Sequence, residues 1–305
     1  MPKPLRSYFI GGILICLLGA ICFSTKAIFV KLAYRDTGIE AVPLLALRMI
    51  FALPFFVISA FISSGRTGNI KFTTGQWFYI SAMGCLGYYV SSLLDFIGLQ
   101  YVSAGIERLI LFIYPTLVLL ISSLIFKVKI MPYQWFAVLV TYAGLLLAFF
   151  GEINFEGAYS RDFYYGSAMI FGCAVTYALY IVGSGKIIPV VGAAKFNSYA
   201  MSFACIGVLL HYYFTSNQSL VGFPALVYAY TLSMALLSTV IPTYLITEGI
   251  KRIGSDNAAI AGSVGPVSTI IQANIFLHEP VFALQVAGTG LILVGVLLIS
   301  RKRNV

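Results

Sequence analysis

Two stretches of the chain decide its fold: GLQYVSAGIERLILFIYPTLVLLISSLIF at residues 98–126 and GIKRIGSDNAAIAGSVGPVSTIIQANIFL at residues 249–277. They align without a gap at an offset of 151 residues, which places Pro115 over Pro266. The same register continues to the end of the last apolar segment and also matches Gly98 with Gly249, Gln134 with Gln285, and Gly144 with Gly295. Apolar segments align easily by chance, but glycine, proline and glutamine pairs in one register predict an internal duplication.

The composition indicates a chain that is surrounded by lipid. Of the 305 residues, 60% are hydrophobic and 10% are charged, and the mean hydropathy is +0.95. A soluble domain is about one-quarter charged. The net charge of +9 comes from basic residues scattered singly between apolar runs, so it predicts membrane topology and no nucleic-acid partner. We therefore expect an all-α, polytopic membrane protein.

Ten segments are expected to cross the bilayer. A hydrocarbon core of about 30 Å requires about 20 helical residues. Cutting the chain at its charges, prolines and turn residues gives expected spans at residues 8–33, 41–63, 75–99, 103–126, 132–150, 164–186, 195–215, 223–248, 256–277 and 281–300. The first span exceeds the apolar region of a secretory signal, which has about 7–15 residues, so we count it as a span.

The basic residues predict how these spans are oriented. With a cytoplasmic N-terminus, thirteen of the 19 Lys and Arg residues fall at the cytoplasmic side, namely Lys3, Arg6, Arg66, Lys71, Lys127, Lys129, Lys186, Lys195, Lys251, Arg252, Arg301, Lys302 and Arg303. Cytoplasmic loops of membrane proteins are enriched in Lys and Arg. We therefore expect a bacterial inner-membrane protein with both termini in the cytoplasm.

The duplication divides the chain into two five-helix repeats, residues 1–150 and 151–305. Because each repeat has an odd number of spans, the second is expected to be inverted relative to the first. Inverted repeats around a central cavity are typical of secondary transporters that work by alternating access. We expect a small-molecule transporter in the lipid bilayer, monomeric or a weak homodimer, with no cofactor and no metal.

The quoted segments resemble the ten-helix, EamA-type branch of the drug/metabolite transporter superfamily. That pattern is a helix hairpin, a helix with a central proline, an acidic turn and a glycine-containing closing helix, and both halves show it. HEP at residues 278–280 matches the acidic turn, whereas Val128 takes that position in the first half. Glu107 and Arg108 stand where the family usually has small residues. The resemblance implies export or exchange of metabolites, with amino acids, aromatic ones included, among the known cargoes.

Five charged residues are expected within the first-half spans: Lys26, Arg48, Asp95, Glu107 and Arg108. An ionisable residue in a span costs at least about 2.5 kcal/mol on insertion scales, so each is a functional candidate. Counted from the outer ends of their spans, all five share one layer. We interpret them as gating or coupling residues, and a structural ion pair is the alternative.

Polar and aromatic residues inside the spans predict a substrate cavity. In the third span, Ser81, Tyr88, Ser92 and Asp95 are spaced to fall on one helical face. The cavity candidates are Tyr88, Ser92, Tyr114, Tyr177, Tyr244, Ser263, Ser268 and Gln272. Such groups need partners that lipid does not offer, although helix–helix packing also supplies them. A tyrosine-lined cavity suits neutral or zwitterionic amino acids.

Three prolines in the spans, Pro115, Pro242 and Pro266, are expected to kink or break their helices, because each lacks a backbone donor. Broken helices at matched positions near the midplane indicate a transporter binding site. A kink that only shapes helix packing is the alternative interpretation.

Other functions have less support in the sequence. His211 and His278 have no acidic or metal-binding partner at a useful spacing, and no GxxxxGK[ST] loop is present. We therefore expect neither an enzyme nor a nucleotide-driven pump. A channel is also less favoured, because the sequence shows no repeated residues of the kind that form a selectivity filter. Exchange of phosphorylated metabolites or nucleotide sugars is the main alternative, because converging Lys26, Arg48 and Arg108 could bind phosphate.

Overall fold

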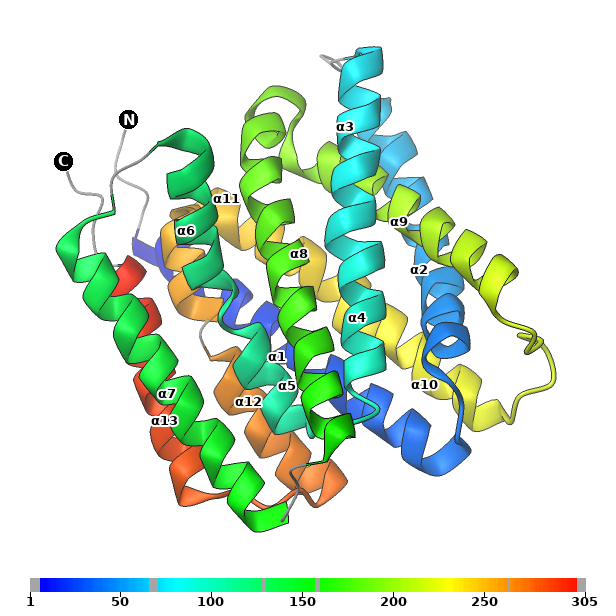
Figure 1. Ribbon diagram of the computed structural model, residues 1–305. Coiled ribbons are helices and arrows are strands. Elements are labelled where there is room, and N and C mark those ends of the chain that lie inside the picture. The colour runs from blue at the N-terminus through cyan, green and yellow to red at the C-terminus, as the bar shows by residue number, and fades with distance from the viewer. Residues whose placement is uncertain (1–5, 66–70, 128–129, 157–159, 263, 301–305) are drawn as a thin grey trace.

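The computed structural model describes residues 6–65, 71–127, 130–156, 160–262 and 264–300, and within these ranges it contains helices and no strand. The α-helices, shown in Figure 1, are α1 (Arg6–Thr37), α2 (Ala41–Ser64), α3 (Thr74–Gly84), α4 (Ser91–Gly98), α5 (Ala104–Leu111), α6 (Tyr114–Phe126), α7 (Pro132–Glu156), α8 (Arg161–Val191), α9 (Ala193–Thr215), α10 (Ala225–Ala235), α11 (Ile241–Gly262), α12 (Gly265–Gln272) and α13 (Ala283–Ser300). The π-helices are η1 (Cys85–Val90), η2 (Leu236–Val240) and η3 (Ala273–Leu277).

Each segment that was expected to span the membrane is mostly helical in its described residues, apart from a few residues at segment ends and the breaks described below. Among the described residues, six helices are by length and composition suited to cross a bilayer, namely Tyr8–Thr37, Ala41–Ser64, Thr74–Gly98, Ala104–Ile125, Arg161–Ile188 and Ala225–Ile246. Three further apolar helices are shorter, namely Pro132–Ala148, Gly265–Leu277 and Ala283–Gly295. Large apolar side chains such as Phe78 and Leu124 are 77% and 80% exposed, as expected of a surface that contacts lipid.

Backbone irregularities recur at the same 151-residue offset as the sequence. The π-helix η1 begins at Cys85 and η2 begins at Leu236. Lys127 and His278, the non-glycine residues with positive φ among those described, have φ values of 54° and 59° and follow directly after α6 and η3. Residues that are 151 positions apart therefore share these backbone irregularities, and the match extends upstream to Cys85.

The helices that carry Pro115 and Pro266 are broken, as expected. Phe112 and Ile113 separate α5 from α6, and α12 likewise begins after a break that follows α11. Each of the two prolines lies in the first turn after its break, where the missing N–H would have no helical acceptor in any case. Pro242 behaves differently, because it directly follows η2 and the chain remains helical through it.

The π-helix η1 changes the polar stripe that was expected along the third span. A π-helical turn accommodates an extra residue, which turns the side chains beyond it by about 100° relative to a regular α-helix. Ser81 lies before η1, whereas Ser92 and Asp95 lie after it. The prediction of one continuous face was therefore wrong at its Ser81 end, since it assumed an uninterrupted α-helix.

The closing helices of the two halves, α7 and α13, pack against each other through small residues (Figure 1). A Cβ added to Gly144 would lie 2.6 Å from the carbonyl oxygen of Gly288, and one added to Gly295 would lie 2.8 Å from that of Ala137. Gly288 and Gly295 stand 151 residues after Ala137 and Gly144. The two helices therefore contact each other through the same pair of matched positions. They run antiparallel, because the earlier position of one helix meets the later position of the other.

The chain reverses direction within α11. A Cβ at Gly19 would contact Ile246 and one at Gly12 would contact Ile253, so α11 first runs antiparallel to α1. Ser24 Oγ then donates a 3.0 Å hydrogen bond to the carbonyl of Gly265, well back along α1. Because a straight helix rises 1.5 Å per residue and could not return that far, α11 must turn after Ile253, as its bent path in Figure 1 shows.

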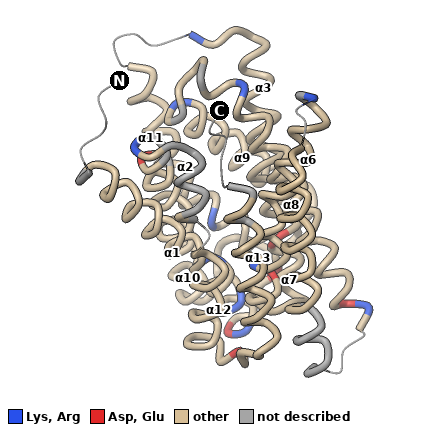
Figure 2. Tube along the Cα trace, turned by 90° about the vertical axis from the view of Figure 1, so that its left-hand side faces the viewer, with Lys and Arg blue, Asp and Glu red and all other residues tan. Residues whose placement is uncertain are grey.

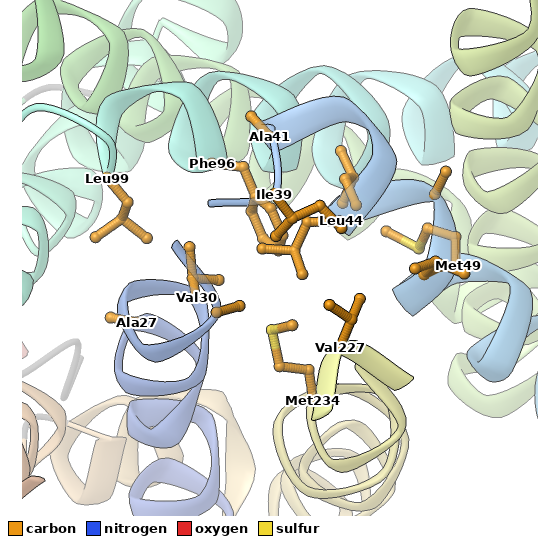
Figure 3. Packing of buried hydrophobic residues seen from close by; sticks show 14 of the residues in the cluster. Ala27, Val30, Ile39, Ala41, Leu44, Met49, Phe96, Leu99, Val227 and Met234 are labelled. Atoms are coloured by element: carbon orange, nitrogen blue, oxygen red, sulfur yellow. The ribbon is translucent and has the colours of Figure 1, made fainter. Parts of the chain in front are cut away.

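The largest apolar cluster packs α1, α2, α4 and α10 together, near the end of the bundle where α1 finishes and α2 starts. Figure 3 shows Val30, Leu44, Phe96 and Met234 from these four helices directed toward one another, with Met49 of α2 to the right of them. All five residues are fully buried. Lipid tails are as apolar as these residues, so close packing is the source of this stabilisation.

Candidate functional site

Four of the five charged residues form one cluster inside the bundle, whereas most other charges in Figure 2 lie toward its ends. Lys26 Nζ lies 2.7 Å from Asp95 Oδ2 and 3.1 Å from Glu107 Oε1. Arg108 Nε lies 3.8 Å from the other carboxylate oxygen of Glu107. The two acidic side chains are 1% and 0% exposed. One ammonium thus serves two buried carboxylates, which compensates part of their desolvation cost.

Arg108 also connects the two halves of the sequence. Its Nε donates a 3.0 Å hydrogen bond to Thr269 Oγ1 on α12, and its Nη2 donates one of 3.2 Å to the carbonyl of Phe23 on α1. The neighbouring Ser24 hydrogen bonds to Gly265 at the start of α12. The broken helix of the second half is therefore attached to the charged layer of the first.

Arg48 lies apart from these ion pairs. Its Nε donates a 2.9 Å hydrogen bond to Thr239 Oγ1 on η2, and its guanidinium carbon lies 5.4 Å from the ring centroid of Phe96. The residue is 4% exposed. Its Nη1 is buried without a hydrogen-bond partner, and no carboxylate of the described residues lies within ion-pair distance. The structure thus joins four of the predicted charges and leaves the fifth without a counter-ion.

Four tyrosines form a continuous row of ring contacts inside the bundle. The ring centroids of Tyr88 and Tyr180 are 5.0 Å apart, those of Tyr180 and Tyr177 are 5.9 Å apart, and those of Tyr177 and Tyr114 are 5.2 Å apart. Tyr88 lies on η1, Tyr114 begins α6 after its break, and the other two lie on α8. The row therefore joins a π-helix to a broken helix.

Tyr244, the fourth predicted tyrosine, lies on α11 outside this row. Its ring stacks on Phe56 with centroids 6.4 Å apart. Tyr244 and Tyr88 pack against the same cluster of buried residues, which includes Phe56 and Ala52 one turn from Arg48. At one end of the row, Tyr88 therefore packs near the turn of α2 that follows Arg48. At the other end, Tyr114 lies directly after the break between α5 and α6.

The remaining predicted cavity residues are not all brought together. Gln272 Nε2 donates to Ser268 Oγ at 2.8 Å and to the carbonyl of Ile21 at 3.5 Å, so this pair faces α1. Ser92 lies half-buried on α4. Ser263 lies outside the described residues. Helix packing is therefore a sufficient account of Ser268 and Gln272 in this structure.

Glu279, in the acidic turn after η3, caps a helix of the other half. Its carboxylate accepts hydrogen bonds from the backbone N–H groups of Ala104 at 3.1 Å and Gly105 at 3.4 Å. These groups begin α5, where a carboxylate complements the helix dipole. Beside this contact lies a hollow of about 510 Å³, lined by Lys31, Tyr34, Arg35, Gly38, Ile39, Leu99, Gln100, Leu277 and Glu279.

Three residues that contact Arg48 or Arg108 were not predicted from the sequence, namely Thr239, Thr269 and Phe96. Threonine and phenylalanine are common in membrane spans, so these residue types alone did not indicate a functional site. The 151-residue offset places Thr239 opposite Tyr88, which was already a candidate, but only the matched π-helices of the structure extend that register upstream of Gly98.

Comparison with known proteins identifies the chain's relatives. The profile of the EamA-like transporter family matches residues 10–150 and 164–301. The Bacillus subtilis protein called "Uncharacterized transporter YcbK" is 34% identical over 287 residues, which cover 92% of this chain and 89% of that protein. The Synechocystis protein called "Uncharacterized transporter sll1319" is 24% identical over 321 residues, which cover 96% and 94%.

A solved crystal structure shares the fold. It superposes on 96% of this chain and 98% of its own with a TM-score of 0.66, at 16% sequence identity. At that identity the likeness concerns the arrangement of the helices and carries no information on substrate.

Proposed function

The chain belongs to the EamA-like transporter family, and on that premise we propose that this multi-pass membrane protein is a secondary transporter that exports or exchanges amino acids, neutral and aromatic ones first. Transport proceeds by alternating access of one central site to the two sides of a bacterial inner membrane. The site lies where the halves meet, at the level of Arg48 and Arg108.

The observation that carries the proposal is the pair of hydrogen bonds that join the halves there. Arg48 of the first half binds Thr239 of the second, and Arg108 binds Thr269 in the same way. Buried polar groups at the interface of two repeats are where a transporter holds its substrate. Changing the relative position of the halves must change both contacts, so the bonds suit a site that opens to alternate sides.

The proposed inversion of the halves draws on the contact between α7 and α13. Gly144 of α7 meets Gly288 of α13, and Ala137 of α7 meets Gly295 of α13. Since Gly288 matches Ala137 and Gly295 matches Gly144 at the 151-residue offset, the two contacts are equivalent by symmetry. A two-fold axis perpendicular to both helices has this property. If the helices cross the bilayer, that axis lies in the membrane plane. The two segments matched by the family profile fall on either side of residue 151, and ten spans with cytoplasmic termini follow from this proposal.

Amino acids are preferred over phosphorylated metabolites because of the charges near the site. Lys26 is paired with Asp95 and Glu107, and Arg108 also faces Glu107. These cations are therefore not available together for the multiple charges of a phosphate ester. The row of tyrosines offers apolar faces with hydroxyl groups, which suit an amphipathic molecule.

Counterflow in liposomes tests the proposed function. The purified protein is reconstituted in vesicles loaded with unlabelled amino acid, and uptake of radiolabelled leucine, phenylalanine or tyrosine is measured against labelled phosphosugars. Accumulation of an amino acid above protein-free vesicles is the expected result. Exchange of phosphosugars alone would contradict the substrate class, and Arg108→Ala with full uptake would contradict a role for the charged layer.

A further inference from the structure

Arg48 has hydrogen-bonding capacity that the protein does not use. A guanidinium carries five N–H donors and is always charged. In this structure Nε is bonded to Thr239 while Nη1 is buried without a partner. A buried charge that lacks a partner is strongly unfavourable. The interior therefore holds a donor group that an anion would satisfy.

The other cations of the charged layer are already compensated. Lys26 contacts two carboxylates, and Arg108 contacts Glu107, Thr269 and the carbonyl of Phe23. Counting Arg48 with them, three cations face two carboxylates, so the layer as a whole carries one positive charge. The carboxylate of a zwitterionic amino acid can pair with Arg48 while the molecule adds no net charge, whereas a phosphate dianion would reverse the sign of the charge of the layer.

Arg48 bonds to one of the two π-helices that begin at matched positions of the chain, η1 and η2. Thr239, its hydrogen-bond partner, lies on η2 at the 151-residue offset from Tyr88 on η1. Tyr88 packs against the buried cluster that includes Ala52, one helical turn from Arg48 on α2. π-helical turns are frequent at functional sites, because they displace one residue from the regular helix. Here η2 supplies the hydroxyl that bonds to Arg48, and η1 carries Tyr88 at the matched position.

The apolar side of this position is aromatic. The Phe96 ring lies against the guanidinium, and Tyr88 packs with Phe56 and Tyr244 around the next turn of α2. A ligand whose carboxylate meets Arg48 would find aromatic faces beside its remaining atoms. This is the chemistry expected for a small carboxylic acid with an apolar or aromatic side chain.

We propose that Arg48 is the anion-binding residue of the substrate site and binds the carboxylate of the transported molecule between η1 and η2. This assignment rests on the proposed transport function and names the group of the substrate that is recognised. Thr239 holds the guanidinium in place and acts as a positioning residue. Lys26, Asp95, Glu107 and Arg108 then form the neighbouring gate or coupling group and do not contact the carboxylate.

The test compares ligands that differ only at the carboxyl group. L-phenylalanine, its amide, its methyl ester and phenethylamine, with the leucine series and inorganic phosphate beside them, compete for counterflow and are added to detergent-purified protein in thermal unfolding assays. We expect the free acids to compete at least about tenfold better than the amides, esters or amines, because charge-assisted hydrogen bonds exceed neutral ones. Equal competition by acid and amide overturns the inference without the need for any variant.

Substitutions separate this role from a structural one. Arg48→Gln should abolish both the preference for the acid and its thermal stabilisation, Arg48→Lys should restore part of both, and Lys71→Gln on the exposed surface should change neither. Counterflow of an amino acid that survives unchanged in Arg48→Gln would overturn the inference and leave the transport function standing. Wild-type protein that no carboxylate in the series stabilises would overturn it as well. Counterflow of phosphosugars alone would refute the proposed amino-acid function.

Discussion

Lys26 holds together a group of charges that the interior would otherwise not tolerate. Its ammonium lies 2.7 Å from Asp95 and 3.1 Å from Glu107, and both acidic side chains are almost fully buried. Removing one member of a buried ion pair costs about 3–5 kcal/mol, mostly because the remaining charge has lost its partner. The stability of the cluster therefore depends more on Lys26 than on either carboxylate alone.

Lys26→Met should lower the free energy of unfolding by about 3–5 kcal/mol, because Asp95 loses its ion-pair partner and Glu107 keeps only Arg108, at 3.8 Å. Thermal unfolding of the detergent-purified protein measures the change. Lys71→Met, at an exposed position, is the matched control and should be close to neutral. Adding Glu107→Gln to Lys26→Met should recover part of the loss. Equal melting temperatures for Lys26→Met and the control would refute this account of the cluster.

Glu279→Gln should destabilise the protein by about 1 kcal/mol, because a neutral amide loses the interaction of the carboxylate with the N-terminus of α5. Ser103, whose hydroxyl accepts from Ile106 N at the same helix end, provides the comparison. Ser103→Ala should cost a similar amount. Both values come from melting curves at one detergent concentration. A Glu279→Gln protein as stable as the wild type would show that the acidic turn does not support α5.

At the scale of single residues, the sequence located the charged layer better than it located the cavity. Lys26, Asp95, Glu107 and Arg108 were expected in one layer and do meet, since lipid leaves buried charges few alternatives to one another. Ser268 and Gln272 instead bond to each other. Hydroxyl and amide groups find partners on their own helix easily, so the sequence alone does not separate packing from a cavity.

Two elements, α7 and α13, depend on glycine for their contact. A Cβ at Gly288 would lie 2.7 Å from the backbone nitrogen of Ala148, whereas one at Gly290 has no atom within 4 Å. Gly288→Val should therefore cost about 3 kcal/mol through overpacking, and Gly290→Val on the same helix should be nearly neutral or slightly stabilising. Melting temperatures of the two variants check this. Similar values for both would mean that the helices can separate without cost.

The elements themselves were largely predictable, and their irregularities were not. Apolar length between charges located the helices, and the prolines located the breaks before Pro115 and Pro266. The π-helices had no such signal. The sequences CLGYYV, LLSTV and ANIFL of η1, η2 and η3 share no residue type that favours a π-turn over an α-turn. That is why the stripe from Ser81 to Asp95 was assigned to one face.

For the whole molecule, cysteine labelling tests the proposed orientation. In a background without the five native cysteines, Asn217→Cys should react with a membrane-impermeant maleimide in intact cells, because it lies in a connection expected outside. Gly75→Cys, which has open space around it, should react only after permeabilisation. The reverse pattern would invert the topology. Reaction of both from one side would contradict an odd number of spans between them, and with it the ten-span arrangement.

The contact between α7 and α13 has a consequence for the origin of the gene. A half-length chain with the face of α7 would fit an identical, upside-down copy of itself, since Gly144 and Ala137 meet each other's counterparts. Such an ancestor would have to insert into the membrane in both directions, which requires nearly balanced loop charges. If the chain arose by fusion of two such copies, each copy needs only one direction. Mutations in either copy then act once per molecule instead of twice, so the halves are free to specialise, as the deep charges of the first half illustrate.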